Sequence, residues 1–153
     1  MLTDQKRPVV GTELFNPVTG TRTVFRATAE STDGAYVEVE ATYPANSAKP
    51  PLHLHPGQDE HFTVLSGHLH ALVDGVEREL SAGDVLEIPR GSSHQLWGGA
   101  HEDSVVRWRI TPALRTDQMF FDLWQAAAEN AFQPDLLRAY TITLDYPDEF
   151  CLC

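Results

Sequence analysis

The sequence predicts an all-β protein, a sandwich or barrel of short strands followed by C-terminal α-helical segments. Three observations carry this prediction: turn signals recur at short intervals, apolar and polar residues alternate between them, and helical periodicity begins near residue 116. The turns separate about eight short runs, a number typical of a sandwich or barrel and not of a parallel α/β sheet.

The first predicted strands follow the turn-forming stretches NPVTG and STDG. One candidate is TRTVFRATA, and a clearer one is AYVEVEATY, in which apolar and polar side chains alternate. The apolar face of the clearer strand consists of Ala35, Val37, Val39 and Ala41. This period of two is typical of a half-buried strand.

The middle of the chain predicts a hairpin and three further strands. The hairpin is HLHALVDGVEREL, because Asp74 and Gly75 readily take the positive φ angles of a two-residue turn. The three strands are DVLEIP, SHQLWG and SVVRWRI. In the last of these the apolar residues form the natural inward face, which directs Arg107 and Arg109 to solvent or to a subunit edge. The reverse orientation would give the two arginines a carboxylate-binding role.

Helical spacing replaces the strand pattern near the C-terminus. The apolar residues of TDQMFFDLWQAAAEN recur at helical spacing, with Asp117 near the start: Met119, Phe120, Leu123, Trp124 and Ala127. We expect this stripe to pack against the barrel or a second subunit. Pro134 can open another short helix through DLLRAY, since proline is tolerated in a first turn. The chain is thus predicted to be one domain over residues 1–153, with the barrel at about 20–112 and the helical tail at about 113–145.

Composition narrows the classes of protein and partner. A chain of 153 residues with 42% hydrophobic and 22% charged residues is typical of a single globular domain. The formal net charge of −11 repels nucleic acid and anionic lipid. No apolar run approaches the ~18 residues of a membrane span, and the N-terminus lacks a secretory h-region. We therefore expect a cytoplasmic protein without nucleic-acid or membrane partners.

The two cysteines, Cys151 and Cys153, lie two residues apart at the end of the chain. A bridge between them would enclose almost no loop, so a disulfide framework is excluded. We expect neither a metal-binding nor a redox role for this tail.

The tripeptide HLH occurs twice, and the first copy has the features of a metal site. Residues two apart in a strand share a face and lie roughly 6 to 7 Å apart, so the rings of His53 and His55 can meet one ion at about 2.1 Å. Pro56 and Gly57 then let the chain turn and begin the next strand. On that strand Glu60 lies on the same inward face as Phe62 and Val64. A carboxylate among apolar neighbours costs free energy unless an ion or a donor meets it.

The second HLH copy lacks such a carboxylate, because no acidic residue follows at comparable spacing and its strand partner is the polar VEREL. We expect four histidines to lie at the surface: His61, His68, His70 and His101. One alternative remains for the first copy. If the inward-facing positions of this strand are shifted by one residue, Asp59 or His61 takes the place of Glu60 as the ligand.

A fourth ligand is expected from GDVLEIPRGSSHQLW. Pro89 and Gly91 form a turn in this stretch, and His94 begins the next strand. Antiparallel pairing can carry His94 next to His53 and His55.

These two stretches resemble the two motifs of the cupin superfamily. The matching string is His53-x-His55-x4-Glu60-x6-Gly67 and then Gly83-x5-Pro89-x-Gly91-x2-His94. The resemblance implies a double-stranded β-helix, a small jelly-roll barrel, with a metal near one mouth held by His53, His55, Glu60 and His94. One departure is Gly98, where the second motif often has Asn, a position that is not a ligand. The alternative is a barrel that keeps this polar cluster without an ion.

Such a site would hold one divalent ion. Three imidazoles and a carboxylate leave two positions open in a six-coordinate ion. This set of ligands suits iron, manganese, nickel, cobalt, copper or zinc. Strand parity directs Phe62, Val64 and Leu96 inward, where they can line an apolar chamber for a small molecule. For each of the three, a place in the barrel core is the alternative.

Two classes of function remain open. The first is a metal-dependent enzyme acting on a small organic molecule, by dioxygenase-like oxidation or by isomerisation or cyclisation, with Glu60 also able to accept a proton. The second is a non-catalytic cupin that binds or senses a small ligand. The amphipathic tail and the exposed barrel edges further predict a homodimer.

Overall fold

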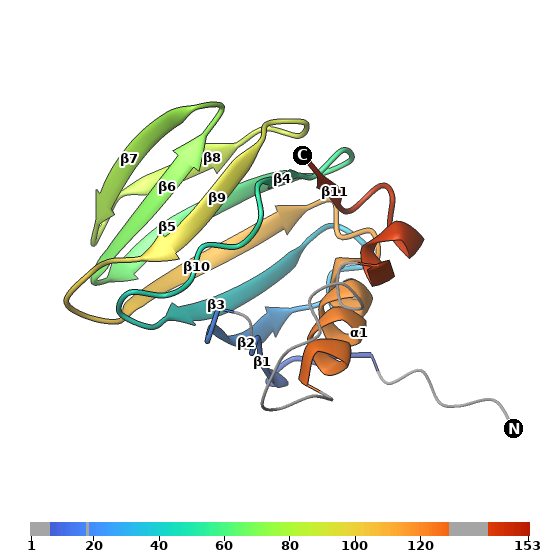
Figure 1. Cartoon of the computed structure of the whole chain (residues 1–153). Coiled ribbons are helices and arrows are strands. Elements are labelled where there is room, and N and C mark those ends of the chain that lie inside the picture. Colours follow the sequence, from blue (N-terminus) through green and yellow to red (C-terminus); the bar gives the residue numbers. More distant parts are fainter. Residues whose placement is uncertain (1–6, 18, 129–140) are drawn as a thin grey trace, which may run out of the picture.

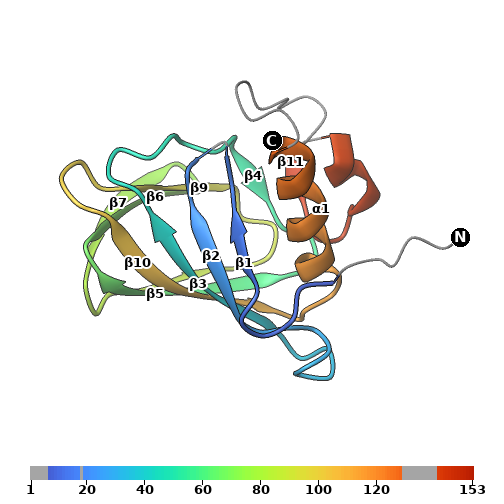
Figure 2. The same ribbon diagram turned by 90° about the horizontal axis from the view of Figure 1, so that it is seen from below.

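Two antiparallel β-sheets face each other, and helix α1 lies beside them (Figures 1 and 2). This is a computed structural model, and it describes residues 7–17, 19–128 and 141–153. The predicted all-β jelly-roll fold with a helix after the barrel is confirmed.

The larger sheet has six strands in the order β1-β2-β3-β10-β5-β8, and every neighbouring pair is antiparallel. Their bounds are Glu13–Phe15 for β1, Arg22–Ala27 for β2, Val37–Tyr43 for β3, Ser104–Thr111 for β10, Asp59–Ser66 for β5 and Val85–Ile88 for β8. Alternation places the apolar side chains of β3 inward as predicted, since Val37, Val39 and Ala41 are fully buried. Ala35 precedes the strand and is exposed.

The smaller sheet has five strands in the order β11-β4-β9-β6-β7. Their bounds are Cys151–Leu152 for β11, His53–Leu54 for β4, His94–Gly98 for β9, His68–Val73 for β6 and Val76–Ser81 for β7. The predicted Asp-Gly turn joins β6 to β7, with positive φ angles of 48° at Asp74 and 82° at Gly75. Strands β1 and β11 extend the sheets beyond the predicted limits of the barrel at about 20 and 112.

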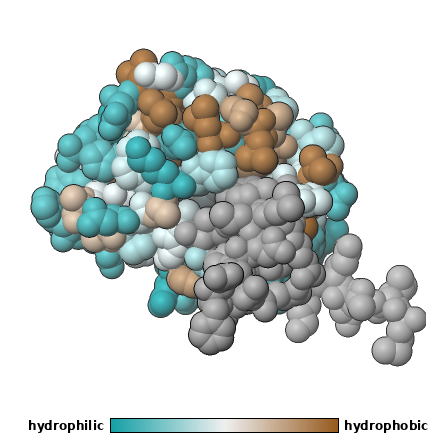
Figure 3. Space-filling model, in the orientation of Figure 1, coloured by the Kyte–Doolittle hydropathy of each residue, from teal (hydrophilic) through white to brown (hydrophobic). Residues whose placement is uncertain are grey.

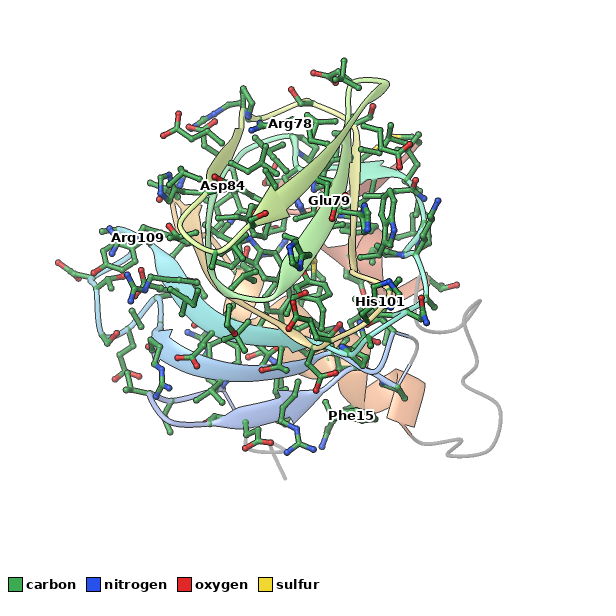
Figure 4. All side chains as sticks on the ribbon, turned by 90° about the vertical axis from the view of Figure 1, so that its left-hand side faces the viewer. Phe15, Arg78, Glu79, Asp84, His101 and Arg109 are labelled. Atoms are coloured by element: carbon green, nitrogen blue, oxygen red, sulfur yellow. The ribbon has the colours of Figure 1, made fainter. Side chains whose placement is uncertain are left out.

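An apolar core fills the space between the two sheets. Phe62, Val64 and Leu96 are all buried in it, together with Leu69 and Val106. The inward parity of these strands therefore agrees with the prediction. On the opposite face of β10, Arg109 points to solvent and pairs with Glu38 at 3.0 Å (Figure 4).

Helix α1 (Thr116–Ala128) packs against the larger sheet. Its apolar stripe buries Met119, Phe120, Leu123 and Trp124, and the Phe120 ring stacks on Trp124 with centroids 4.6 Å apart. Packing against the barrel is thus confirmed for this stripe. The side chain of Ala127 and the second predicted helix, from Pro134 to Tyr140, lie outside the described residues. Among the described residues, none of the helices has the length and apolarity that crossing a membrane requires.

The last part of the chain returns to the smaller sheet. After the short 3-10 helix η1 (Thr143–Asp145), strand β11 adds to the edge of β4. Both cysteines in this segment are free and exposed. Hydrophilic surface covers much of the face shown in Figure 3, and apolar residues gather there around β4 and β11.

Candidate metal centre

Three histidines and one glutamate meet inside the barrel. His53 lies on β4, Glu60 on β5 and His94 on β9, and the backbones of His53 and His94 are direct partners across the sheet. The candidate ligand nitrogens of His53, His55 and His94 lie within 4.8 Å of one another. Oε1 of Glu60 lies 2.9 Å from Nε2 of both His55 and His94. The structure therefore brings the four predicted residues together, and their role as metal ligands stays a prediction.

Backbone carbonyls orient all three imidazole rings. The Nδ1 atoms lie 2.7 Å from the oxygen of Pro51 for His53, 2.6 Å from that of Glu149 for His55, and 2.9 Å from that of Ser92 for His94. A carbonyl oxygen can only accept, so each Nδ1 carries the proton that it donates. The Nε2 lone pairs are then left for the centre, the arrangement that metal-binding histidines use.

The orientation of Glu60 leaves one oxygen for an ion. Its Oε2 accepts a 2.5 Å hydrogen bond from Nε1 of Trp108, and the residue is only 2% exposed. Within the described part of the chain, Oε1 of Glu60 and Nε2 of His55 have no hydrogen-bond partner of good geometry, although they lie 2.9 Å apart. Two lone pairs this close repel unless a proton or a cation lies between them. The donor set therefore fits a divalent ion.

The pKa values of these groups depend on one another when no ion is bound. Burial raises the pKa of Glu60, but the neighbouring His55 and His94 outweigh it and hold that pKa below its usual range. Burial lowers the pKa of His55, but the Glu60 carboxylate outweighs it and raises that pKa. At His53, burial and then the other two histidines lower the pKa to about 4. Both pKa shifts favour a protonated His55 imidazole beside an ionised Glu60 carboxylate when no ion is bound.

We expect a divalent ion to displace this proton, releasing about one proton per site near neutral pH. Because the pKa of His55 is raised, competition should begin above the ordinary histidine value of about 6.5, and affinity should fall as the pH falls. Calorimetric titration with zinc in buffers of different ionisation enthalpy measures the release. Equal binding enthalpies in all buffers would contradict a proton held at the site.

A cavity opens from this centre, and with its mouth it contains about 760 Å³ of unfilled space. Phe62 and Leu96 of the apolar core also line this cavity, whereas Val64 does not, and a role of the two in binding a substrate stays a prediction. Helix α1 also lines it, a role that its helical period alone did not reveal. Besides the histidines, the aromatic members of the wall are Tyr43, Phe62, Trp108, Phe120, Trp124 and Phe150.

Nothing in the sequence indicated that the C-terminal segment belongs to this centre. The Phe150 ring stacks on His53, with centroids 4.9 Å apart and planes 15° from parallel. Glu149 supplies the carbonyl that holds His55, while its buried side chain pairs with Arg115 at 3.1 Å. A backbone carbonyl has no signature in a sequence. Phe150 could have been noticed only by its alternation with Leu152, and it lies just before a strand that is two residues long.

The second HLH copy lies apart from the centre, as predicted. His68 pairs with Glu102 at 3.0 Å, and His70 stacks on Trp97 with centroids 5.5 Å apart. The loop residue His101 is exposed (Figure 4).

The alternative frame for the carboxylate is wrong. Asp59 is exposed and pairs with Arg90 at 3.1 Å, and His61 reaches Glu87 at 3.3 Å on the outer face. Glu60 is thus the residue of this stretch that faces the histidines.

Gly98, the departure from the second cupin motif, has a steric reason. A Cβ atom built there would lie 2.4 Å from the carbonyl oxygen of Pro44, closer than van der Waals contact permits. The amide of Gly98 also donates to Oγ of Ser47 at 2.7 Å. The loop after β3 therefore lies directly against this position and excludes an asparagine side chain.

Comparison with known proteins agrees with this architecture. The family profile described as "Cupin domain" matches residues 39–110, a range that includes all four candidate ligands. A solved RmlC-like cupin from Shewanella frigidimarina superposes with a TM-score of 0.58 at 21% identity, over 69% of this chain and 87% of that one. Residues 39–110 of this chain are a cupin domain. The polyketide cyclase RemF from Streptomyces resistomycificus shares the cupin fold at a TM-score of 0.58 and 18% identity, over 69% of this chain and 78% of that one.

Curated relatives of this cupin carry oxidoreductase names. The oxidoreductase iacF of Pestalotiopsis fici is 55% identical over 49 residues, which are 31% of this chain and 24% of the relative. The probable oxidoreductase yanE of Aspergillus niger is 30% identical over 119 residues, 72% of this chain and 44% of the relative. The cupin thus spans less than half the length of these relatives.

Proposed function

We propose that this cupin is a metal-dependent oxidoreductase that oxidises a small organic molecule and consumes dioxygen. The observation that carries the proposal is the convergence of three Nε2 atoms and one carboxylate oxygen on the wall of an aromatic cavity. The oxidoreductase names of its relatives support the same class of reaction.

His53, His55, Glu60 and His94 would hold one ion of iron, manganese, nickel, cobalt, copper or zinc. A bound ion supplies Lewis-acid polarisation of a substrate oxygen and, if redox-active, electron transfer to dioxygen. Sequence and donor set favour no single metal within this group, because imidazole and carboxylate suit all of them.

The chain's own groups orient the reaction and move its proton. Trp108 fixes Glu60 through Oε2, so that Oε1 faces the histidines and the cavity. Glu60 is therefore our candidate to accept a proton from the substrate when its contact with the ion loosens. Phe62, Trp108 and Phe150 keep water from this end of the cavity, which strengthens electrostatic interactions there.

The proposal is tested by oxygen uptake. Protein loaded separately with each candidate metal is supplied with a panel of catechols, flavonols and diketones, and dioxygen consumption is recorded. We expect uptake with at least one redox-active metal and none with zinc, which cannot change its oxidation state.

Thermal unfolding of the same samples separates the other functions. Turnover without oxygen uptake would replace oxidation by isomerisation or cyclisation. Ligands that raise the melting temperature without any turnover would instead make the protein a non-catalytic binding cupin.

A further inference from the structure

A group of hydroxyls lines the cavity in addition to the candidate ligands. It consists of Thr19, Thr21 and Tyr43, which we call the hydroxyl cluster. Tyr43 is 8% exposed, and its hydroxyl makes no hydrogen bond with any described residue. Buried hydroxyls are normally paired, so a free one at a cavity wall calls for a partner that enters the cavity.

The hydroxyls of the two threonines can hydrogen-bond to the same ligand. Their Oγ1 atoms lie 2.7 Å apart, and the amide of Thr21 donates to Oγ1 of Thr19 at 3.3 Å. One hydroxyl donates to the other, so a second hydroxyl proton and unused lone pairs remain for a ligand.

The hydroxyl cluster and the metal centre lie at opposite ends of the larger sheet. On β10, Ser104 is the partner of Tyr43 on one side, and Ile110 is the partner of Glu60 on the other. Six residues separate these positions, about 20 Å along the strand at the backbone. Side chains from both ends line the same cavity, so the cavity runs along the barrel between them.

The wall between the two ends suits an uncharged aromatic ligand. Aromatic rings favour stacked or edge-on contact with another ring, and Phe62, Trp108 and Phe120 offer both faces and edges. Among the described lining residues, Glu60 is the only one with a formal charge when the histidines are neutral. Apart from an ion at the metal centre, this described lining therefore offers no cation that could pair with a carboxylate or phosphate.

We propose that the cavity binds an uncharged, planar aromatic molecule with oxygen substituents at both ends, one at the metal centre and one hydrogen-bonded by the hydroxyl cluster. The metal end of this inference rests on the proposed function, whereas the hydroxyl end does not. Tyr43 is thus a residue that selects the substrate by its remote oxygen.

The test compares two planar probes that differ by that oxygen alone and are long enough to reach from one end to the other, trans-4-hydroxystilbene and trans-4,4′-dihydroxystilbene. Binding to zinc-loaded protein is measured by calorimetry, because zinc holds the ligand without turnover. We expect the second hydroxyl to strengthen binding about fivefold, the gain of one neutral hydrogen bond, and Tyr43→Phe to remove that gain. Tyr36→Phe is the matched control, since Tyr36 stacks under Arg109 on the outer face. Thr21→Val is a second variant should Tyr43→Phe unfold.

Each outcome decides one part of the proposal. Equal binding of both probes to the unmodified protein overturns the role of the hydroxyl cluster and leaves the metal centre intact. On metal-free protein, tighter binding of trans-4-stilbenecarboxylate than of either probe overturns the uncharged ligand class. If zinc does not bind at all, the proposed function fails, and the same titrations on metal-free protein still decide whether Tyr43 selects for the second hydroxyl.

Discussion

Replacing His94 with alanine is expected to lower the affinity for a divalent ion by at least about 100-fold and to abolish turnover. Loss of a residue that merely supports a metal ligand already costs about 10- to 100-fold, and His94 is itself a candidate ligand. Its ring is 1% exposed and its Nε2 atom lies 2.9 Å from Glu60, so water cannot simply take over its place in the centre. Competition with a chromophoric chelator measures the affinity directly.

The matched control for this variant is His68→Ala. It also removes one imidazole, but His68 belongs to the second HLH copy and pairs with Glu102 on the surface. We expect this variant to bind metal like the unmodified protein. If both variants lose the ion equally, or if neither does, then the cluster of His53, His55, Glu60 and His94 is not the metal site.

Ending the chain after Asp148 is the change with the second largest expected effect. It removes the Glu149 carbonyl that holds Nδ1 of His55 and the Phe150 ring that stacks on His53. Since two of the candidate ligands lose their supporting partner, we expect the metal affinity to fall by about 10- to 100-fold. In protein loaded with cobalt, the visible absorption should also change, because it reports the ligand arrangement independently of activity.

A chain that ends after Phe150 provides the control. It keeps the carbonyl and the ring but loses strand β11, whose residues are exposed. Retention of metal affinity here, with loss in the shorter chain, would assign the effect to Glu149 and Phe150. Full affinity in both truncated chains would show that the C-terminal segment does not support the ligands.

The features that could be predicted well from the sequence are those that depend on the alternation of side chains within one strand. Alternation along β3 and β5 placed Val37, Val39 and Glu60 inward, because strand residues two apart must share a face. The register of β4 and β9 was also accessible, since spacing within the cupin motifs implied that His53 and His94 meet.

The features that escaped prediction depend on contacts distant in sequence. His55 and Glu149 are 94 residues apart, and their contact involves a carbonyl that every residue possesses. Tyr43 was the last apolar-face residue of a strand, and nothing local showed that its hydroxyl faces a cavity. Val64 had the correct parity for the chamber, but its position along the strand placed it in the core. The alternation of side chains along a strand shows which face of the sheet a residue lies on, but not how far along the barrel it lies.

The contact between His55 and Glu149 also bears on when the protein can acquire an ion in the cell. A ribosome adds roughly 5 to 20 residues per second, so these two positions emerge about 5 to 19 seconds apart. During that interval the nascent chain already carries its histidines but not the carbonyl that sets the tautomer of one of them. If the centre binds an ion, we therefore expect loading to follow translation, and a polypeptide interrupted before Glu149 to compete poorly for scarce ions.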